Sequence, residues 1–372
     1  MRTIDSIIAE LQGIASNPKK AMDDYKKATG KGAVGIMPVY SPEELVHAAG
    51  YLPIGMWGGQ KKISKARTFL PPFACSIMQE VMELELDGVY DDLETVIFSV
   101  PCDTLKCVSQ KWKGKCPTIV FTHPQNRKIE AANVFTKGEY EVVKEQLEKT
   151  LNVKITDEAL SNSIKVYNDN RRTMREFSDL AADYPNIITP AKRHAVIKAR
   201  HFMEKSQHTA LVKELIAAVK KTEKQAWTGK KVILTGIMAE PDGLLDILQS
   251  NNFAVVADDL AQESRQFRVD VDESGDPLYA LAKAWQDLDG CSLATDAKKP
   301  RGQMIIDAVK KYKADAVIVC MMKFCDPEEW DYPILIQEFE KAGIKNIMIE
   351  VDQEASAFEQ TKTRIQSFAE LL

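Results

Sequence analysis

Short apolar segments alternate with helical segments in two parts of the chain, and this alternation limits the possible folds more than any other feature. The first part carries four apolar segments, at residues 33–38, 52–57, 95–100 and 118–122. The second part carries four more, at residues 231–235, 254–257, 314–322 and 347–351. Each has the length of a buried strand, and a helical segment commonly follows it. Strands that alternate with helices form parallel sheets, so each part predicts an α/β unit.

The middle of the chain, from residue 140 to residue 227, contains no convincing strand and predicts consecutive helices, the first of them beginning at Glu139. The sequence thus predicts an N-terminal α/β domain at 1–139, a helical connecting segment at 140–227 and a C-terminal α/β domain at 228–372. The expected fold class is α/β, with two Rossmann- or flavodoxin-like parallel-sheet domains and the functional site in the cleft between them.

The charge and the apolar content exclude several classes of protein. Lys and Arg number 49 and Asp and Glu number 54, which gives a net charge of −5 and excludes a broad basic surface for nucleic acid or for membranes. The longest apolar run, Ala316–Met322, is far shorter than the roughly 20 residues of a membrane-spanning helix. The first residues lack the apolar core of a signal peptide. We therefore expect a cytoplasmic protein without nucleic-acid or membrane partners.

Three of the seven cysteines stand where an α/β sheet places its ligands. Cys102 and Cys325 each follow an apolar strand and precede Asp at a helix start, and Cys75 lies near a third helix start. Ligands of open α/β sheets gather beyond the carboxyl ends of the strands, and amides at a helix N-terminus favour a thiolate. Three thiolates without a matching histidine suit an iron–sulfur cluster better than a closed zinc site. The alternative is three unrelated buried or reactive cysteines.

The other four cysteines are weaker candidates. The chain has seven cysteines in all, and an odd number in a reducing compartment argues against a disulfide framework. Cys107 and Cys116 could complete a local metal site with Cys102, although Cys107 falls within a helix. Cys320 lies inside an apolar strand and is expected to be a small buried side chain. Cys291 stands in a loop without an evident partner.

Further polar residues have both a functional and a structural interpretation. Three histidines recur every seven residues and are interpreted as surface side chains: His194, His201 and His208. His123 follows a strand and could be functional or could bond the backbone. An acidic run could be a polar site or a set of helix caps: Asp258, Asp259 and Glu263. No P-loop sequence occurs, so hydrolysis of ATP by that route is not expected.

Longer segments around these residues resemble the β-subunits of the 2-hydroxyacyl-CoA dehydratases, and the similarity extends over essentially the whole chain. The segments are Pro42–Gly50, Phe73–Ser76, Pro101–Leu105, His123–Arg127, Asp258–Glu263 and Met321–Glu329. The resemblance implies a larger homologous α-subunit as partner and a [4Fe–4S] cluster held by three cysteines. The positions that match the family's ligands are Cys75, Cys102 and Cys325.

The resemblance also implies a radical mechanism. A separate ATP-dependent iron–sulfur activator delivers one electron, the thioester becomes a ketyl radical that expels its hydroxyl group, and the products are an enoyl-CoA and water. The 2-hydroxyacyl-CoA substrate is expected mainly on the larger subunit, so the cluster of this chain would store or relay the electron. Such an oxygen-sensitive lyase would serve amino-acid fermentation. No catalytic residue is assigned to this chain, and a bound flavin, present in some relatives, stays open.

Several alternatives stay open beside this interpretation. The chain could be a subunit of a benzoyl-CoA reductase-like enzyme or a double-cubane cluster protein, which would need Cys107 or Cys320 as an additional ligand. It could also be a non-catalytic α/β binding protein with incidental cysteines and no iron. Lys106 and Lys323 lie near the expected ligands and could favour the reduced cluster or be solvated surface residues.

Overall fold

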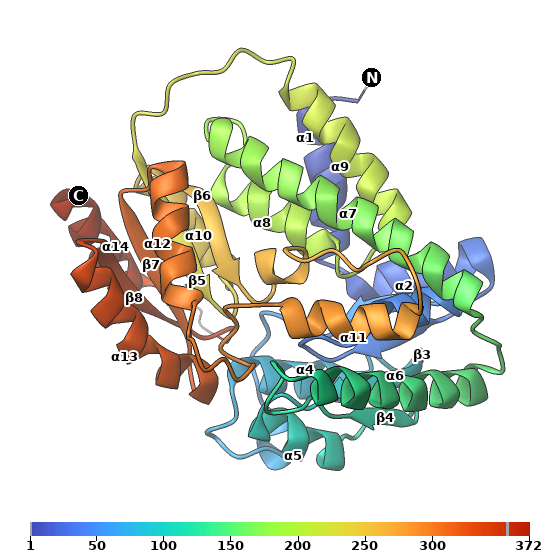
Figure 1. The fold of residues 1–372 in the computed structure, drawn as a ribbon. Coiled ribbons are helices and arrows are strands. Elements are labelled where there is room, and N and C mark those ends of the chain that lie inside the picture. The colour runs from blue at the N-terminus through green and yellow to red at the C-terminus, as the bar shows by residue number, and fades with distance from the viewer. Residues whose placement is uncertain (1, 355–356) are drawn as a thin grey trace.

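Two four-stranded parallel sheets form the frame of the molecule, as a computed structural model shows for residues 2–354 and 357–372. The strands are β1 Ala33–Ile36, β2 Leu52–Gly55, β3 Leu93–Ser99, β4 Thr118–Phe121, β5 Lys230–Gly236, β6 Phe253–Leu260, β7 Ala316–Met322 and β8 Lys345–Val351. They lie in the orders β2-β1-β3-β4 and β6-β5-β7-β8 (Figure 1). Every strand pair is parallel, which confirms the predicted α/β class with two parallel-sheet units.

The two sheets repeat the same strand order, so that β3 and β7 occupy equivalent positions. Each is the third strand of its sheet, and each is followed by a Cys-Asp pair that begins a helix. In the second sheet, β5 approaches β7 closely at Gly236, where φ is 141°. A Cβ atom at Gly236 would lie 2.2 Å from the carbonyl oxygen of Cys320, so this register requires glycine.

Helices flank both sheets. They are α1 Ile4–Ala15, α2 Pro18–Thr29, α3 Glu43–Ala48, α4 Ser76–Leu86, α5 Asp103–Lys111, α10 Asp242–Ser250, α11 Pro277–Asp287, α12 Arg301–Tyr312, α13 Asp326–Lys341 and α14 Glu359–Leu371, with short 3₁₀ turns η1 Ala66–Thr68 and η2 Ser264–Gln266. Side chains before several of them accept hydrogen bonds from first-turn amides, as Thr3, Asn17 and Asp276 do. These caps explain why the helices begin at those residues.

Four consecutive helices form the middle of the chain, and the predicted absence of strands between residues 140 and 227 is confirmed. They are α6 Glu130–Leu151, α7 Asp157–Asp183, α8 Pro190–Ala199 and α9 Lys205–Val219. Helix α6 begins at Glu130, earlier than the expected Glu139. The start was missed because its N-cap residue, Ile129, makes no side-chain cap hydrogen bond and so gives no signal in the sequence. The predicted boundary between residues 139 and 140 therefore falls inside α6.

Elements that are far apart in sequence share apolar clusters. Ile7 and Leu11 of α1 pack with Val196 of α8 and Val212 of α9, so the first helix lies against the helical middle (Figure 1). Leu281 of α11 belongs to a cluster with residues of α6, and α11 lies beside α6. The division into parts at 1–139, 140–227 and 228–372 stays a prediction.

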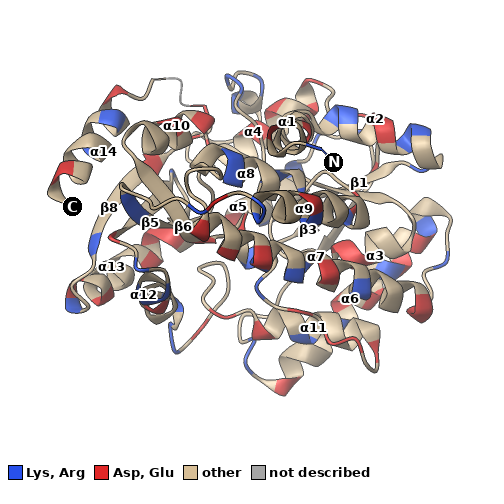
Figure 2. Cartoon of the chain, turned by 90° about the horizontal axis from the view of Figure 1, so that it is seen from above, with Lys and Arg blue, Asp and Glu red and all other residues tan. Residues whose placement is uncertain are grey.

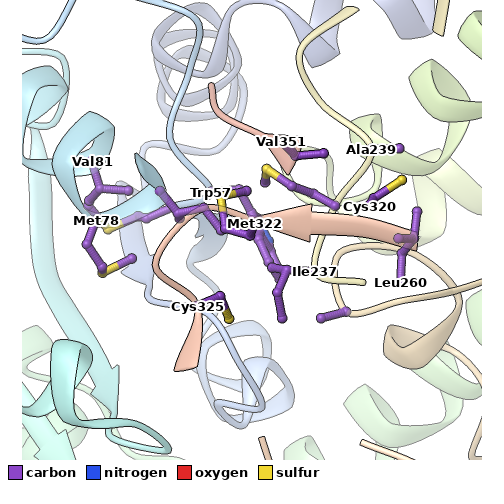
Figure 3. Packing of buried hydrophobic residues seen from close by; sticks show 14 of the residues in the cluster. Trp57, Met78, Val81, Ile237, Ala239, Leu260, Cys320, Met322, Cys325 and Val351 are labelled. Carbon is purple, nitrogen blue, oxygen red and sulfur yellow. The ribbon is translucent and has the colours of Figure 1, made fainter. Parts of the chain in front are cut away.

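The largest apolar cluster joins the two sheets. It contains Phe98 of β3, Leu234 of β5 and Met322 of β7, together with Met78 of α4. Figure 3 shows Met322 beside Met78 and Trp57, so side chains from both halves meet there. The cysteines of interest lie at the edge of this shared core.

The surface carries charges of both signs. Figure 2 shows acidic and basic residues interspersed along the helices seen from above, α7 among them. No helix in the described part of the chain combines the length and apolar character needed to span a membrane.

Candidate functional site

Three cysteines from both halves of the chain occupy the N-cap positions of three helices. Cys75 precedes α4, Cys102 precedes α5 and Cys325 precedes α13. None of the three cysteines makes a side-chain cap hydrogen bond, but amides in the first turn of each helix lower the pKa of the corresponding thiol. The thiols therefore sit where helix dipoles favour negative charge. The turn before Cys325 holds Phe324 at φ 61°, a left-handed conformation that is costly for an aromatic residue.

Cys325 is buried and Cys75 and Cys102 are half-buried, and the three thiols lie close enough for charge on one to act on another. Burial raises the pKa of Cys75 to about 12, and the nearby Cys102 adds to the rise. Burial, Glu328 and the thiols of Cys75 and Cys102 hold the pKa of Cys325 well above its usual range. Burial also raises the pKa of Cys102. The expectation of thiolate-prone cysteines is thus wrong for the thiols by themselves, because desolvation outweighs the helix amides; a bound metal ion reverses that balance.

The donor set fits a polynuclear cluster better than a single ion. Among residues 2–354 and 357–372, no three His, Cys, Asp or Glu side chains converge on one point where a metal ion could bind. In an iron–sulfur cluster each cysteine binds a separate iron atom, so the thiols stand apart around the cluster. Three soft sulfur donors at the edge of an apolar core suit iron and sulfide rather than a hard cation.

The two lysines near these cysteines differ in their surroundings. Lys106 is an exposed residue of α5. Lys323 lies 4.0 Å from Asp352 and its ammonium group stands 5.5 Å from the centre of the Phe324 ring. This ion pair is long and half-exposed, so it holds Lys323 only weakly.

The remaining cysteines lie in three different settings. Cys320 is 0% exposed in β7, as predicted, and Figure 3 shows it within the strand while Cys325 lies beyond the strand end. Cys107 is exposed, and Cys116 is half-buried with a pKa that burial raises to about 11. Cys291 does have a partner, which the sequence did not reveal: the Tyr40 hydroxyl lies 2.8 Å from its sulfur.

The three histidines of the helical middle are buried, so their interpretation as surface residues is wrong. Helix α8 ends before residue 200 and α9 begins at residue 205, so the spacing of seven does not follow one exposed face. His201 and His208 donate to backbone carbonyls through Nε2, and burial lowers the pKa of each to about 3. His194 lies between Glu240 and Glu263 at 3.1 and 2.8 Å. Burial would lower the pKa of His194, but these two carboxylates raise it to about 9.

His194 gives a prediction for the pH dependence of stability. Because its folded pKa lies above the usual value of about 6.5, its charge stabilises the fold fully below about pH 6.5, and this contribution is lost as the pH rises through about 9. We expect His194→Asn to lower the free energy of unfolding more at about pH 6 than at about pH 10, measured by urea unfolding against the parent protein at each pH. An equal loss at both values would contradict a charged His194.

The acidic run after β6 holds buried arginines. Asp259 accepts from Arg265 at 2.9 Å, Arg268 at 2.7 Å and Arg301 at 2.8 Å. Burial would raise the pKa of Asp259, but these guanidinium groups hold it well below its usual range. Asp258 and Glu263 pair with a further buried arginine on α8. This network links β6 to α8 and α12, and its role is structural.

His123 lies against the second half of the chain. Its ring stacks on Trp285 of α11 with centroids 4.5 Å apart, and burial lowers its pKa to about 3. A neutral imidazole packed in this way contributes to the contact between the two halves.

Comparison with known proteins identifies the family. Residues 38–372 match the family model of the 2-hydroxyglutaryl-CoA dehydratase D-component. The chain is 66% identical over the full length of both proteins to the lactoyl-CoA dehydratase β-subunit of Anaerotignum propionicum. It is 44% identical, again over both full lengths, to the (R)-phenyllactyl-CoA dehydratase β-subunit of Clostridium sporogenes. It is 38% identical, over 99% of this chain and 100% of the relative, to the (R)-2-hydroxyglutaryl-CoA dehydratase β-subunit of Acidaminococcus fermentans. The chain therefore belongs to the β-subunit family of the 2-hydroxyacyl-CoA dehydratases.

Proposed function

We propose that this chain is the electron-storing or electron-relaying β-subunit of a radical (R)-2-hydroxyacyl-CoA dehydratase, a hydro-lyase that forms (E)-2-enoyl-CoA and water. One observation carries the proposal: Cys75, Cys102 and Cys325, from both halves of the chain, stand at the N-cap positions of three helices and belong to or pack against the same apolar cluster. Membership in a family of dehydratase β-subunits supports the reaction class. The relative with 66% identity is named for lactoyl-CoA, so (R)-lactoyl-CoA is the first substrate to test.

In this proposal Cys75, Cys102 and Cys325 hold a [4Fe–4S] cluster, which when bound supplies the storage and transfer of a single electron. Each sulfur must lose its proton to bind iron, and the raised pKa values mean that loading releases protons from buried thiols. The amides at the starts of α4, α5 and α13 would then stabilise the negative charge on the sulfurs. The low dielectric at the edge of the apolar core strengthens this electrostatic stabilisation.

A larger homologous α-subunit and an ATP-dependent iron–sulfur activator complete the enzyme in this proposal. The substrate and its acid–base groups belong to the α-subunit, so no catalytic residue is assigned to this chain. Large aromatic side chains close in sequence to the proposed ligands support a partner surface: Phe73 is 68% exposed and Trp330 is 82% exposed. Exposed aromatic groups of this kind are typical of protein interfaces.

The isolated chain is expected to show no dehydratase activity, because the substrate binds on the α-subunit and the electron comes from the activator. Addition of the α-subunit, the activator and ATP under anaerobic conditions should give enoyl-CoA, measured by chromatography. The α-subunit should copurify through an interface of at least about 1,000 Å². Turnover by this chain and the activator alone would contradict the proposal.

A variant of the exposed aromatic residue on α13 tests the partner surface. Trp330→Ser should weaken copurification of the α-subunit, since aromatic residues dominate interface energies. The exposed Tyr279 on α11 provides a matched control, and Tyr279→Ser should leave copurification unchanged. Normal copurification together with impaired electron delivery in Trp330→Ser would instead assign this surface to the activator.

A further inference from the structure

A buried carboxylate, that of Glu328, lies three residues after Cys325 and has no part in the proposed ligand set. Glu328 occupies the third position of α13, the helix that Cys325 caps. Only 1% of Glu328 is exposed, whereas the next residue, Glu329, is exposed. A buried charge lies in a medium of low dielectric and acts strongly on its surroundings. The position of Glu328 therefore allows its charge to act on the group that Cys325 binds.

The side chain of Glu328 does not make the contact that is usual at this helix position. A glutamate at the third position of a helix commonly accepts a hydrogen bond from the amide of the N-cap residue. Here the amide of Cys325 donates to the carbonyl of Met322 at 3.1 Å. The carboxylate of Glu328 is turned inward. Its Oε1 accepts from the Ser292 hydroxyl at 2.6 Å, and its Oε2 accepts from Nη2 of Arg301 at 2.8 Å.

Buried arginines hold this carboxylate in an ion pair. Besides Arg301, the guanidinium group of Arg265 lies 3.4 Å from Oε1 of Glu328. Both arginines also bind Asp259, so α13 shares the buried network that follows β6. A guanidinium group keeps its charge in a protein interior, and it pairs with a carboxylate anion. The contact thus fastens α13 to the second sheet and fixes a negative charge near the start of the helix.

The charge of Glu328 acts on the sulfur of Cys325. Burial is the largest cause of the raised pKa of Cys325, and the carboxylate of Glu328 raises this pKa further, ahead of the thiols of Cys75 and Cys102. The backbone amide of Glu328 has the opposite effect and lowers the pKa of Cys325. The amide of this residue therefore favours negative charge on the sulfur, and its carboxylate opposes it.

We infer that Glu328 is a positioning residue of the electron site, whose buried carboxylate acts through Cys325 and keeps the reduction potential of the cluster low. The inference rests on the proposed function, because it requires Cys325 to be a cluster ligand. Reduction adds negative charge to a cluster, and a fixed negative charge beside one of its ligands opposes that step. An electron held at a low potential is passed on more readily, which suits a subunit that stores or relays it.

A redox titration of the full-length, iron-loaded chain tests the inference, with the reduced cluster measured by electron paramagnetic resonance under anaerobic conditions. Glu328→Gln keeps the shape of the side chain and the backbone amide but removes the charge. Its midpoint potential should rise by at least the amount that changes the ratio of reduced to oxidised cluster tenfold, about 59 mV for one electron. Glu328→Asp keeps the charge, so its midpoint potential should stay closer to that of the parent chain.

Two further variants separate the charge of Glu328 from its surroundings. Glu329→Gln is the matched control, because it removes an exposed carboxylate from the next position of α13. Solvent and salt screen that charge, so the midpoint potential should equal that of the parent chain. Ser292→Ala keeps the carboxylate but removes the hydroxyl group that donates to it. Since less positive charge then offsets the carboxylate, the midpoint potential should fall.

The outcomes distinguish this inference from the proposed function. A folded, iron-loaded Glu328→Gln chain with the parent midpoint potential would overturn the inference and leave the proposed function intact. An equal rise in Glu329→Gln would overturn it as well. Where Glu328→Gln does not fold, as judged by circular dichroism, Ser292→Ala decides, and a midpoint potential that does not fall overturns the inference. A parent chain that holds no iron would overturn the proposed function, and the inference with it.

Discussion

Cys325→Ala is expected to abolish the iron–sulfur content of the purified chain, from about four iron and four sulfide per chain to nearly none. Cys75 and Cys102 come from the first half of the molecule and Cys325 comes from the second. Cys325→Ala therefore removes the one proposed ligand that the second half contributes. Two thiols do not hold a cubane cluster with comparable affinity. Anaerobic purification with iron and sulfide analysis and an absorption spectrum measures the effect, and activity of the assembled enzyme should fall with the iron.

The neighbouring cysteines provide matched controls. Cys320 lies five residues before Cys325 but is buried within β7, and Cys107 is exposed on α5. Cys320→Ala should cost roughly 1 kcal/mol of stability and keep the iron. Cys107→Ser should leave both the stability and the iron content unchanged. Loss of iron in either control while the protein stays folded would replace the three-ligand set with a larger one.

Asp259→Ala is expected to cost about 3–5 kcal/mol in the free energy of unfolding, the loss typical of a broken buried ion pair. Asp259 is the carboxylate that Arg265, Arg268 and Arg301 share, and two of these arginines are almost fully buried. Removing it leaves guanidinium charge in the interior without its partner. Guanidinium chloride unfolding followed by circular dichroism measures the change.

Two further variants separate charge from shape at this position. Asp259→Asn keeps the shape and loses the charge, so it should also be strongly destabilised. Asp270→Ala removes a carboxylate that pairs with Arg175 at the surface, and it should cost less than about 1 kcal/mol. Equal stability losses in Asp259→Ala and Asp270→Ala would show that the buried network does not stabilise the fold as argued.

Strands such as β1, β2 and β7 were predictable because both of their faces are buried, which makes each strand a continuous apolar run. The segment at 314–322 corresponds to β7 at Ala316–Met322, and the other seven strands also lie where the sequence places them. Boundaries without a local signal were missed. Helix α6 begins after Ile129, and an apolar N-cap does not mark a helix start.

Side-chain partners were less predictable, because they come from distant parts of the chain. His194 meets Glu240 and Glu263, which lie 46 and 69 residues away, and its polar character alone indicated a surface position. Cys291 meets Tyr40 across 251 residues. The helix-start positions of Cys102 and Cys325 were accessible because strand, Cys and helix start are adjacent in sequence. The position of Cys75 was accessible because Pro71 and Pro72 indicate a nearby helix start.

Because the proposed ligands lie in both halves of the chain, the complete ligand set exists only late in the synthesis of the protein. Ribosomes add about 5–20 residues per second, so the stretch from Cys102 to Cys325 takes on the order of 10–40 s to make. During that interval the first sheet can fold while two of its thiols have no third partner. Iron–sulfur assembly factors would therefore have to act on a nearly full-length chain, after translation has passed β7, and a truncated product that ends before Cys325 would leave the ribosome without a complete ligand set.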